Sequence, residues 1–252
     1  MKTEILIHIP HSSYNIPNKY KPLFLISETE LKKEQLLMTD SYTNEIFNLD
    51  YKQIIFPISR LICDVERFRN ENDEEMTKQG MWVCYTKTHN QKPLKAVSEE
   101  HKQEILNKYY DKHHQLFEKE VENILKNNNN CLIIDAHSFC SKQLPYELYK
   151  DTKRPDICLG TNDFHTNKET INYFKTVFEQ KGYNIEINSP FKGTIVPLKY
   201  YQKDKRVQSI MIEINRSLYM NEVTGKKIND FLKLKSDLKE IINSFSFNLH
   251  LE

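Results

Sequence analysis

The sequence predicts an α/β fold in which a mixed, largely parallel sheet lies between layers of helices. Short apolar runs, typical of buried strands, alternate along the chain with longer stretches that have the hydrophobic period of amphipathic helices. The length of 252 residues suits one large α/β domain, and neither an internal repeat nor a shift in composition marks a boundary. We therefore expect one domain over residues 1–250, with Leu251-Glu252 set aside as a cloning scar.

The composition argues against several classes of protein. The 36 basic and 35 acidic side chains give a formal charge of +1, which is too balanced for electrostatic binding to nucleic acid or to a membrane surface. No apolar run approaches the length of about 18 residues that crosses a membrane. The 5 glycines fit neither a GxGxxG nor a Walker A loop. The five scattered cysteines contain no CxxC pair, so we expect a reducing, cytoplasmic location.

The first half of the chain begins with an apolar run that breaks at Pro10. Ser27 and Glu30 form a capping box, which predicts the start of a helix. The elements predicted here are a strand at 4–9, a loop at 11–14, a helix from 28 to 49 with a break at 39–40, strands at 54–58 and 61–65, and a loop at 69–79.

In the second half, the clearest prediction is a long helix that starts at Ser98, a favourable N-cap, with Glu99 and Glu100 in its first turn. Thr166 and Glu169 predict a second capping box. The elements predicted here are helices from 98 to 126 and from 166 to 182, strands at 131–134, 183–187 and 207–214, and a closing helix at 224–245.

Two histidines stand just after predicted strands. His11 follows the first strand and His137 follows the strand at 131–134. Ligands favour the carboxyl edge of an α/β sheet, so the two imidazoles could join a carboxylate in a zinc site that keeps one position for water. A pair of hydrogen-bonded loop histidines is the alternative. We expect His8, on the strand itself, to be a satisfied core histidine and the pair His113-His114 to face solvent.

Two aspartates stand near these histidines. Asp135 lies two residues before His137 on extended chain, so both side chains share one side, and the carboxylate could orient the imidazole as carboxylates do around zinc. The residues around Asp40 by themselves favour an N-cap for the second half of its helix.

Three charged residues accompany apolar segments. Arg60 and Arg67 flank the run at 61–65, where a planar guanidinium suits a carboxylate substrate or an oxyanion, with surface salt bridges as the alternative. Glu213 is an acid in a strongly apolar strand, so it needs a partner, a raised pKa or a catalytic task. A structural pair with Arg216 or Arg206 is the competing interpretation.

Several motifs follow one another in a specific order. They are HSS from His11, Asp40 with Thr43 and Glu45, SRLICDVERF from Ser59, DAHS from Asp135, RPDICLG from Arg154, PFKGT from Pro190 and IEINRSLYM from Ile212. In this series the chain resembles the N-formylglutamate amidohydrolase family, whose fold is similar to that of zinc carboxypeptidases and aspartoacylases. The resemblance implies a three-layer α/β/α domain with a hydrolytic zinc at the sheet edge.

The resemblance also implies roles for individual residues. His11 and His137 are expected to be zinc ligands with Asp40 as the third, and Glu66 is the alternative carboxylate. The other implied roles are those of Glu213 as general base, Arg60 as oxyanion stabiliser, Arg67 as clamp for a substrate carboxylate, Asn215 and Arg216 as pocket residues, and Asp135 as the carboxylate behind a ligand.

The activity implied is zinc-dependent hydrolysis of a linear, non-peptide amide in a small molecule, above all an N-formyl or N-acyl acidic amino acid such as N-formyl-L-glutamate. A zinc peptidase or cell-wall amidase on the same fold, or a binding member without catalysis, is the alternative. The chain departs from the family pattern at Ser13, Lys95 and Lys192, and at Glu66, where other branches have asparagine.

Overall fold

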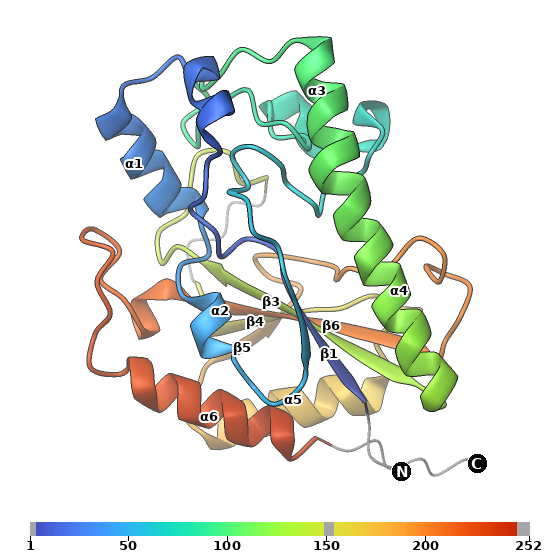
Figure 1. Cartoon of the computed structure of the whole chain (residues 1–252). Coiled ribbons are helices and arrows are strands. Elements are labelled where there is room, and N and C mark those ends of the chain that lie inside the picture. Colours follow the sequence, from blue (N-terminus) through green and yellow to red (C-terminus); the bar gives the residue numbers. More distant parts are fainter. Residues whose placement is uncertain (1–3, 149–153, 246–252) are drawn as a thin grey trace.

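A six-stranded sheet forms the centre of the computed structural model, which describes residues 4–148 and 154–245 (Figure 1). The strands are β1 (Ile5–Ile9), β2 (Lys52–Ile55), β3 (Cys131–Phe139), β4 (Ile157–Gly160), β5 (Ile185–Ile187) and β6 (Val207–Asn215), in the order β2-β1-β3-β6-β4-β5. Neighbouring strands are parallel except β4 and β6, which are antiparallel. The predicted mixed, largely parallel sheet is therefore confirmed. The pair Leu251-Glu252 lies outside the described residues.

Helices cover both faces of this sheet. The α-helices are α1 (Glu28–Met38), α2 (Thr43–Ile46), α3 (Glu99–Ile105), α4 (Asp111–Asn127), α5 (Lys168–Gln180) and α6 (Phe231–Asn243). Short 3-10 helices are η1 (Asn18–Leu23), η2 (Glu71–Asp73), η3 (Glu75–Gln79) and η5 (Arg216–Leu218), and the π-helical turn η4 (Leu106–Tyr110) joins α3 to α4. Figure 1 shows α4 along one face and α5 and α6 along the other. In the part of the chain that is described, no helix is long and apolar enough to cross a membrane.

The alternation of side chains along the strands assigns each residue to a face. Ile5, Ile7 and Ile9 of β1 pack in the cluster that contains residues of α5 and α6, whereas Leu6 packs with Phe117 of α4. The same period of two places four polar residues on the α4 face, towards the carboxyl ends of their strands. These four are His8, Asp135, His137 and Glu213. The alternation thus delivers polar side chains from three neighbouring strands to one edge of the sheet.

The helix predictions are confirmed in part. Ser27 and Glu30 form the capping box that starts α1, and the break near Asp40 separates α1 from α2. Ser98 caps α3. The capping box at Thr166 is wrong, because Asn167 caps α5 one residue later with its own side chain. The closing helix also begins later than predicted, at Phe231.

The strand predictions are wrong at 61–65 and incomplete elsewhere. Residues 61–65 are buried but form turns, since an apolar run is compatible with a buried turn as well as with a strand. The strand at 54–58 lies earlier, as β2, and its pairing ends before Pro57, which has no N–H to donate. β3 continues to Phe139, so that it carries the predicted site residues inside the strand and not beyond it. β4 was not predicted.

A buried lysine holds the turn at 61–65. The Lys95 ammonium, 3% exposed, donates to the backbone carbonyls of Leu61 and Ile62, which no strand partner satisfies. Burial lowers the pKa of Lys95 to about 8. Because Arg60 and Asp64 flank the carbonyls that Lys95 binds, this contact positions two residues of the site described below.

We expect the stability of the protein to rise with pH through this lysine. Its pKa falls from 10.5 unfolded to about 8 folded, so between these values the folded state binds fewer protons than the unfolded state and gains stability as pH rises. The free energy of unfolding, measured by urea denaturation from pH 7 to 10, should rise relative to Lys95→Met. Parallel pH curves for the two proteins would contradict the assignment. Lys32→Met, at an exposed lysine of α1, controls for the loss of one charge.

Candidate active site

A cavity of about 580 Å³ opens where the carboxyl ends of β1, β3 and β6 meet. Nearly all of the predicted site residues line it. They are His11, Asp40, Arg60, Glu66, Arg67, Asp135, His137, Glu213 and Arg216. Among the described residues that line the cavity, Asn215 is absent. The tertiary structure therefore brings together residues that are up to about two hundred positions apart in the chain.

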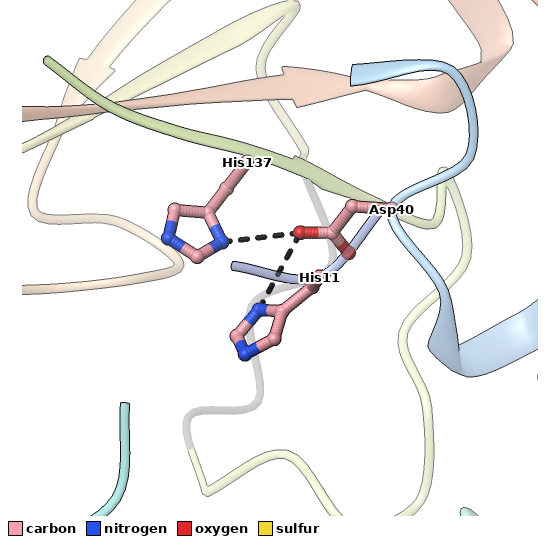
Figure 2. A group of neighbouring side chains, drawn as sticks. All are labelled: His11, Asp40 and His137. Atoms are coloured by element: carbon pink, nitrogen blue, oxygen red, sulfur yellow. Dashed lines mark hydrogen bonds and ion pairs between the residues drawn. The ribbon is translucent and has the colours of Figure 1, made fainter. Parts of the chain in front are cut away.

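Asp40 lies between the two predicted histidine ligands (Figure 2). Its Oδ2 is 3.1 Å from Nδ1 of His137 and 3.7 Å from Nδ1 of His11. All three residues are buried, and one donor atom of each lies within 4.8 Å of the others. The backbone N–H of Asp40 also donates to the carbonyl of His11 at 2.9 Å, which ties the loop after β1 to the loop after α1. The N-cap interpretation of Asp40 is wrong, because the residue before α2 is Tyr42.

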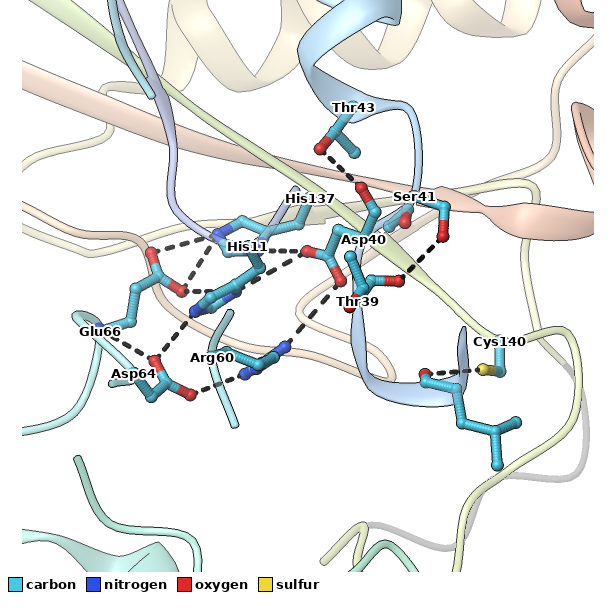
Figure 3. Close-up of polar contacts among 12 residues, drawn as sticks. His11, Thr39, Asp40, Ser41, Thr43, Arg60, Asp64, Glu66, His137 and Cys140 are labelled. Atoms are coloured by element: carbon cyan, nitrogen blue, oxygen red, sulfur yellow. Dashed lines mark hydrogen bonds and ion pairs between the residues drawn. The ribbon is translucent and has the colours of Figure 1, made fainter. Parts of the chain in front are cut away.

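Carboxylates stand behind both imidazoles (Figure 3). Nε2 of His11 donates to Oδ1 of Asp64 at 2.9 Å. Nε2 of His137 is 3.1 Å from Asp135 and 3.1 Å from Glu66. Since each Nε2 carries a proton towards a carboxylate, each Nδ1 is directed at Asp40. This arrangement of a carboxylate behind each histidine is common among metal ligands.

The electrostatics of this group favour a cation. Burial by itself lowers the pKa of His137, but Glu66 and Asp135 outweigh it and raise that pKa well above its ordinary value. Burial by itself raises the pKa of Asp40, yet hydrogen bonds from both histidines hold it below its ordinary range. A divalent metal would replace protons on the two Nδ1 atoms, as metals do at neutral imidazole ligands.

The residues fit a zinc ion better at Asp40 than at a neighbouring cluster. Two imidazoles and one carboxylate are a common ligand set of zinc sites that keep an open position. Nδ1 of His11 is buried without a hydrogen-bond partner in the described chain. The second cluster that could hold a metal is His8, Glu66 and Asp135. There Nδ1 of His8 already donates to Asp135 at 2.9 Å, so its proton and lone pair are accounted for.

Glu213 is a buried carboxyl group close to the proposed ligands. It lies opposite His137 in the register of β3 and β6 and is 8% exposed. Its Oε2 has no hydrogen-bond partner among the described residues, and burial raises its pKa to about 8. The competing interpretation as a structural ion pair is not what the structure has, because Arg216 binds Asp40 at 3.0 Å and Arg206 binds Asp204 at 2.6 Å.

The two predicted arginines of the cavity wall share one carboxylate. Nη2 of Arg60 donates to Asp64 at 2.8 Å, and Nε of Arg67 is 3.5 Å from the same Asp64 Oδ2. Their side chains are only 12% and 20% exposed, so they are not surface salt bridges. Each retains a buried Nε without a hydrogen-bond partner in the described chain. Sequence reasoning missed Asp64, although it stands four residues after Arg60.

Arg216 and Asn215 have structural contacts. Arg216 donates to Oδ1 of Asp40 at 3.0 Å and to Oγ of Ser138 at 3.1 Å, so it anchors the Asp40 carboxylate while lining the cavity. Asn215 donates to the carbonyl of Pro155 at 3.0 Å and accepts from the N–H of Ser217. The structure therefore uses Asn215 to cap η5, not to line the pocket.

The remaining histidines are buried. His8 is fully buried with both ring nitrogens hydrogen-bonded, as predicted for a core histidine. The expectation that His113 and His114 face solvent is wrong: His113 is 6% exposed and bonded to His8, and His114 donates to the carbonyl of Val65 at 2.8 Å. α4 turns this side towards the sheet, because Phe117 and Val121 continue the same buried stripe.

Comparisons with known proteins agree with this geometry. The family model for N-formylglutamate amidohydrolase matches residues 3–220. A curated N-formylglutamate deformylase from Pseudomonas putida is 28% identical over 129 residues, and the match spans 50% of this chain and 47% of that protein, about half the length of each.

Two solved structures share the fold. An N-formylglutamate amidohydrolase from Ralstonia eutropha JMP134 superposes with a TM-score of 0.82 at 18% identity, covering 95% of this chain and 91% of that one. A gene product from Agrobacterium tumefaciens gives a TM-score of 0.64 at 16% identity, covering 96% and 90%. With the family model matching well over half of its length, this chain belongs to the N-formylglutamate amidohydrolase family.

Proposed function

We propose that this chain hydrolyses the amide bond of an N-acyl acidic amino acid, with N-formyl-L-glutamate as the first candidate, and that it requires zinc. The observation that carries the proposal is the convergence of Nδ1 of His11, Oδ2 of Asp40 and Nδ1 of His137 on one buried point beside an unpartnered Glu213. The family of the chain and the activity named for its relatives support the same substrate.

His11, Asp40 and His137 would hold the zinc ion, with Asp64 and Asp135 orienting the two imidazoles from behind. When bound, zinc at such a site supplies Lewis-acid polarisation of the carbonyl and makes water acidic enough to react near neutral pH. The rest of the reaction falls to the side chains of the cavity.

Glu213 is the proposed general base. Its raised pKa makes the carboxylate a stronger proton acceptor, so it can take the proton of the attacking water and return it to the nitrogen of the leaving amine. Arg60 would stabilise the oxyanion that develops on the acyl oxygen, through donors left over from its bond to Asp64. Arg67 would bind a carboxylate of the substrate.

The experiment that tests the function is metal analysis of the purified protein followed by formate release from N-formyl-L-glutamate, before and after chelation. We expect bound zinc, turnover, loss of turnover on chelation and recovery when zinc is restored. Peptides and N-acyl amino acids tested in parallel separate this activity from that of a peptidase. Bound zinc without turnover of any amide would favour a binding protein and contradict the proposal.

Glu213→Gln should retain zinc and lose activity. A general base contributes about 100-fold to 10,000-fold, so kcat should fall within that range while the zinc content stays that of the native protein. Glu186→Gln, at an exposed acid of β5, is the matched control. Loss of zinc in Glu213→Gln would mean that the residue is a ligand and not the base.

Arg67→Ala should weaken substrate binding. A hydrogen-bonded charge pair contributes about 1.5–3 kcal/mol, so kcat/KM should fall by roughly 10-fold to 150-fold. The loss should disappear for the substrate analogue in which the bound carboxylate is an amide, and the two mono-amides of N-formyl-glutamate identify which carboxylate that is. An equal loss on both mono-amides and on the parent substrate would assign Arg67 a structural task only.

A further inference from the structure

A chain of buried hydrogen bonds runs from the proposed ligand His137 to helix α4. Oδ1 of Asp135 is 3.1 Å from Nε2 of His137 and 2.9 Å from Nδ1 of His8. On its far side, Nε2 of His8 is 2.9 Å from Nε2 of His113. None of these four residues is more than 6% exposed. Three strands and helices thus contribute to one line of polar contacts that ends at the candidate metal site.

The direction of these bonds follows from what each atom can donate. A carboxylate only accepts, so both His137 and His8 donate to Oδ1 of Asp135. A neutral His8 with its proton on Nδ1 has a lone pair on Nε2, so His113 donates to it. His8 also stacks on Phe117, with ring centroids 4.7 Å apart and planes 4° from parallel, which fixes the plane of the imidazole.

The register of the sheet gives this bond a geometric consequence. His8 and Asp135 are direct partners across β1 and β3. β1 leads to His11 three residues later, and β3 carries His137 two residues later. The His8 to Asp135 bond therefore connects the two segments that carry the histidine ligands, next to the point where those ligands converge.

A purely structural role does not account for the chemistry of these positions. His8 and His113 occupy places in the interface of the sheet with α4 that neighbouring residues fill with apolar side chains, such as Leu6, Phe117 and Val121. Burying imidazoles there costs free energy unless every nitrogen is satisfied, whereas leucine or phenylalanine would fill the space without that requirement.

We propose that His8 is a positioning residue of the metal site: its Nδ1 proton holds Asp135 in the orientation that directs Nδ1 of His137 at the zinc. This inference rests on the proposed function, because it presupposes a zinc ion at His11, Asp40 and His137. His113 acts one step further away by fixing which nitrogen of His8 carries the proton.

Two polar substitutions at His8 separate the positioning role from packing. In His8→Asn the amide nitrogen takes the place of Nδ1 and keeps the donor to Asp135. In His8→Gln the longer side chain places its amide near the former Nε2, where it can reach His113 but not Asp135. Both variants bury one amide, so they are a matched pair for stability.

The readouts are the zinc dissociation constant, measured by competition with a chelator at fixed pH, and the melting temperature. Removing a group that orients a metal ligand typically costs about 10-fold to 100-fold in metal affinity. We expect His8→Gln to bind zinc at least about 10-fold more weakly than native protein and His8→Asn to recover most of that loss. Phe117→Leu, which disturbs the packing of His8 without touching Asp135, should lower the melting temperature and leave zinc affinity near the native value.

Equal zinc affinities for His8→Asn and His8→Gln would overturn the inference and leave the proposed function intact. A native protein that binds no zinc would overturn both. A loss of zinc affinity in Phe117→Leu as large as that in His8→Gln would also overturn the inference, since packing alone would then explain the effect.

Discussion

The carboxylate of Asp40 is the interaction on which the site depends. A buried carboxylate without partners is strongly unfavourable, and here two imidazoles and the guanidinium of Arg216 compensate it. These partners come from the loop after β1, from β3 and from η5. Satisfying one charge therefore requires three distant segments to meet, and the place where they meet is the bottom of the cavity.

The other carboxylates of the site divide by whether their charge is compensated. Asp64 and Asp135 each accept hydrogen bonds from a histidine, and Asp64 also from Arg60, so both stay ionised despite their burial. Glu213 lies among the same residues with one oxygen unpartnered and its pKa raised. Groups of one chemical type thus acquire different tasks from their surroundings: the paired carboxylates orient ligands, and the unpaired one is suited to move a proton.

The predictions that succeeded rest on local physics. Side-chain alternation placed Asp135 with His137 on one face, and the capping residues Ser27 and Ser98 fixed two helix starts within a few residues of sequence. Those that failed depended on distant partners. Residues 61–65 read as a strand by hydrophobicity, but their carbonyls bind Lys95, about thirty residues later in the chain. His113 read as exposed until its partner His8, from another strand, was in place.

The sequence by itself determined the α/β class, the family resemblance and the residue types at the sheet edge, because periodicity, capping and ordered motifs are properties of contiguous chain. Only the tertiary structure decided that Asp40 and not Glu66 faces Nδ1 of both histidines, and that Arg216 is bound to Asp40 and so leaves Glu213 unpartnered. A side chain's partner in the interior depends on which strands become neighbours and in which register they pair, and that choice minimises uncompensated charge over the whole molecule at once.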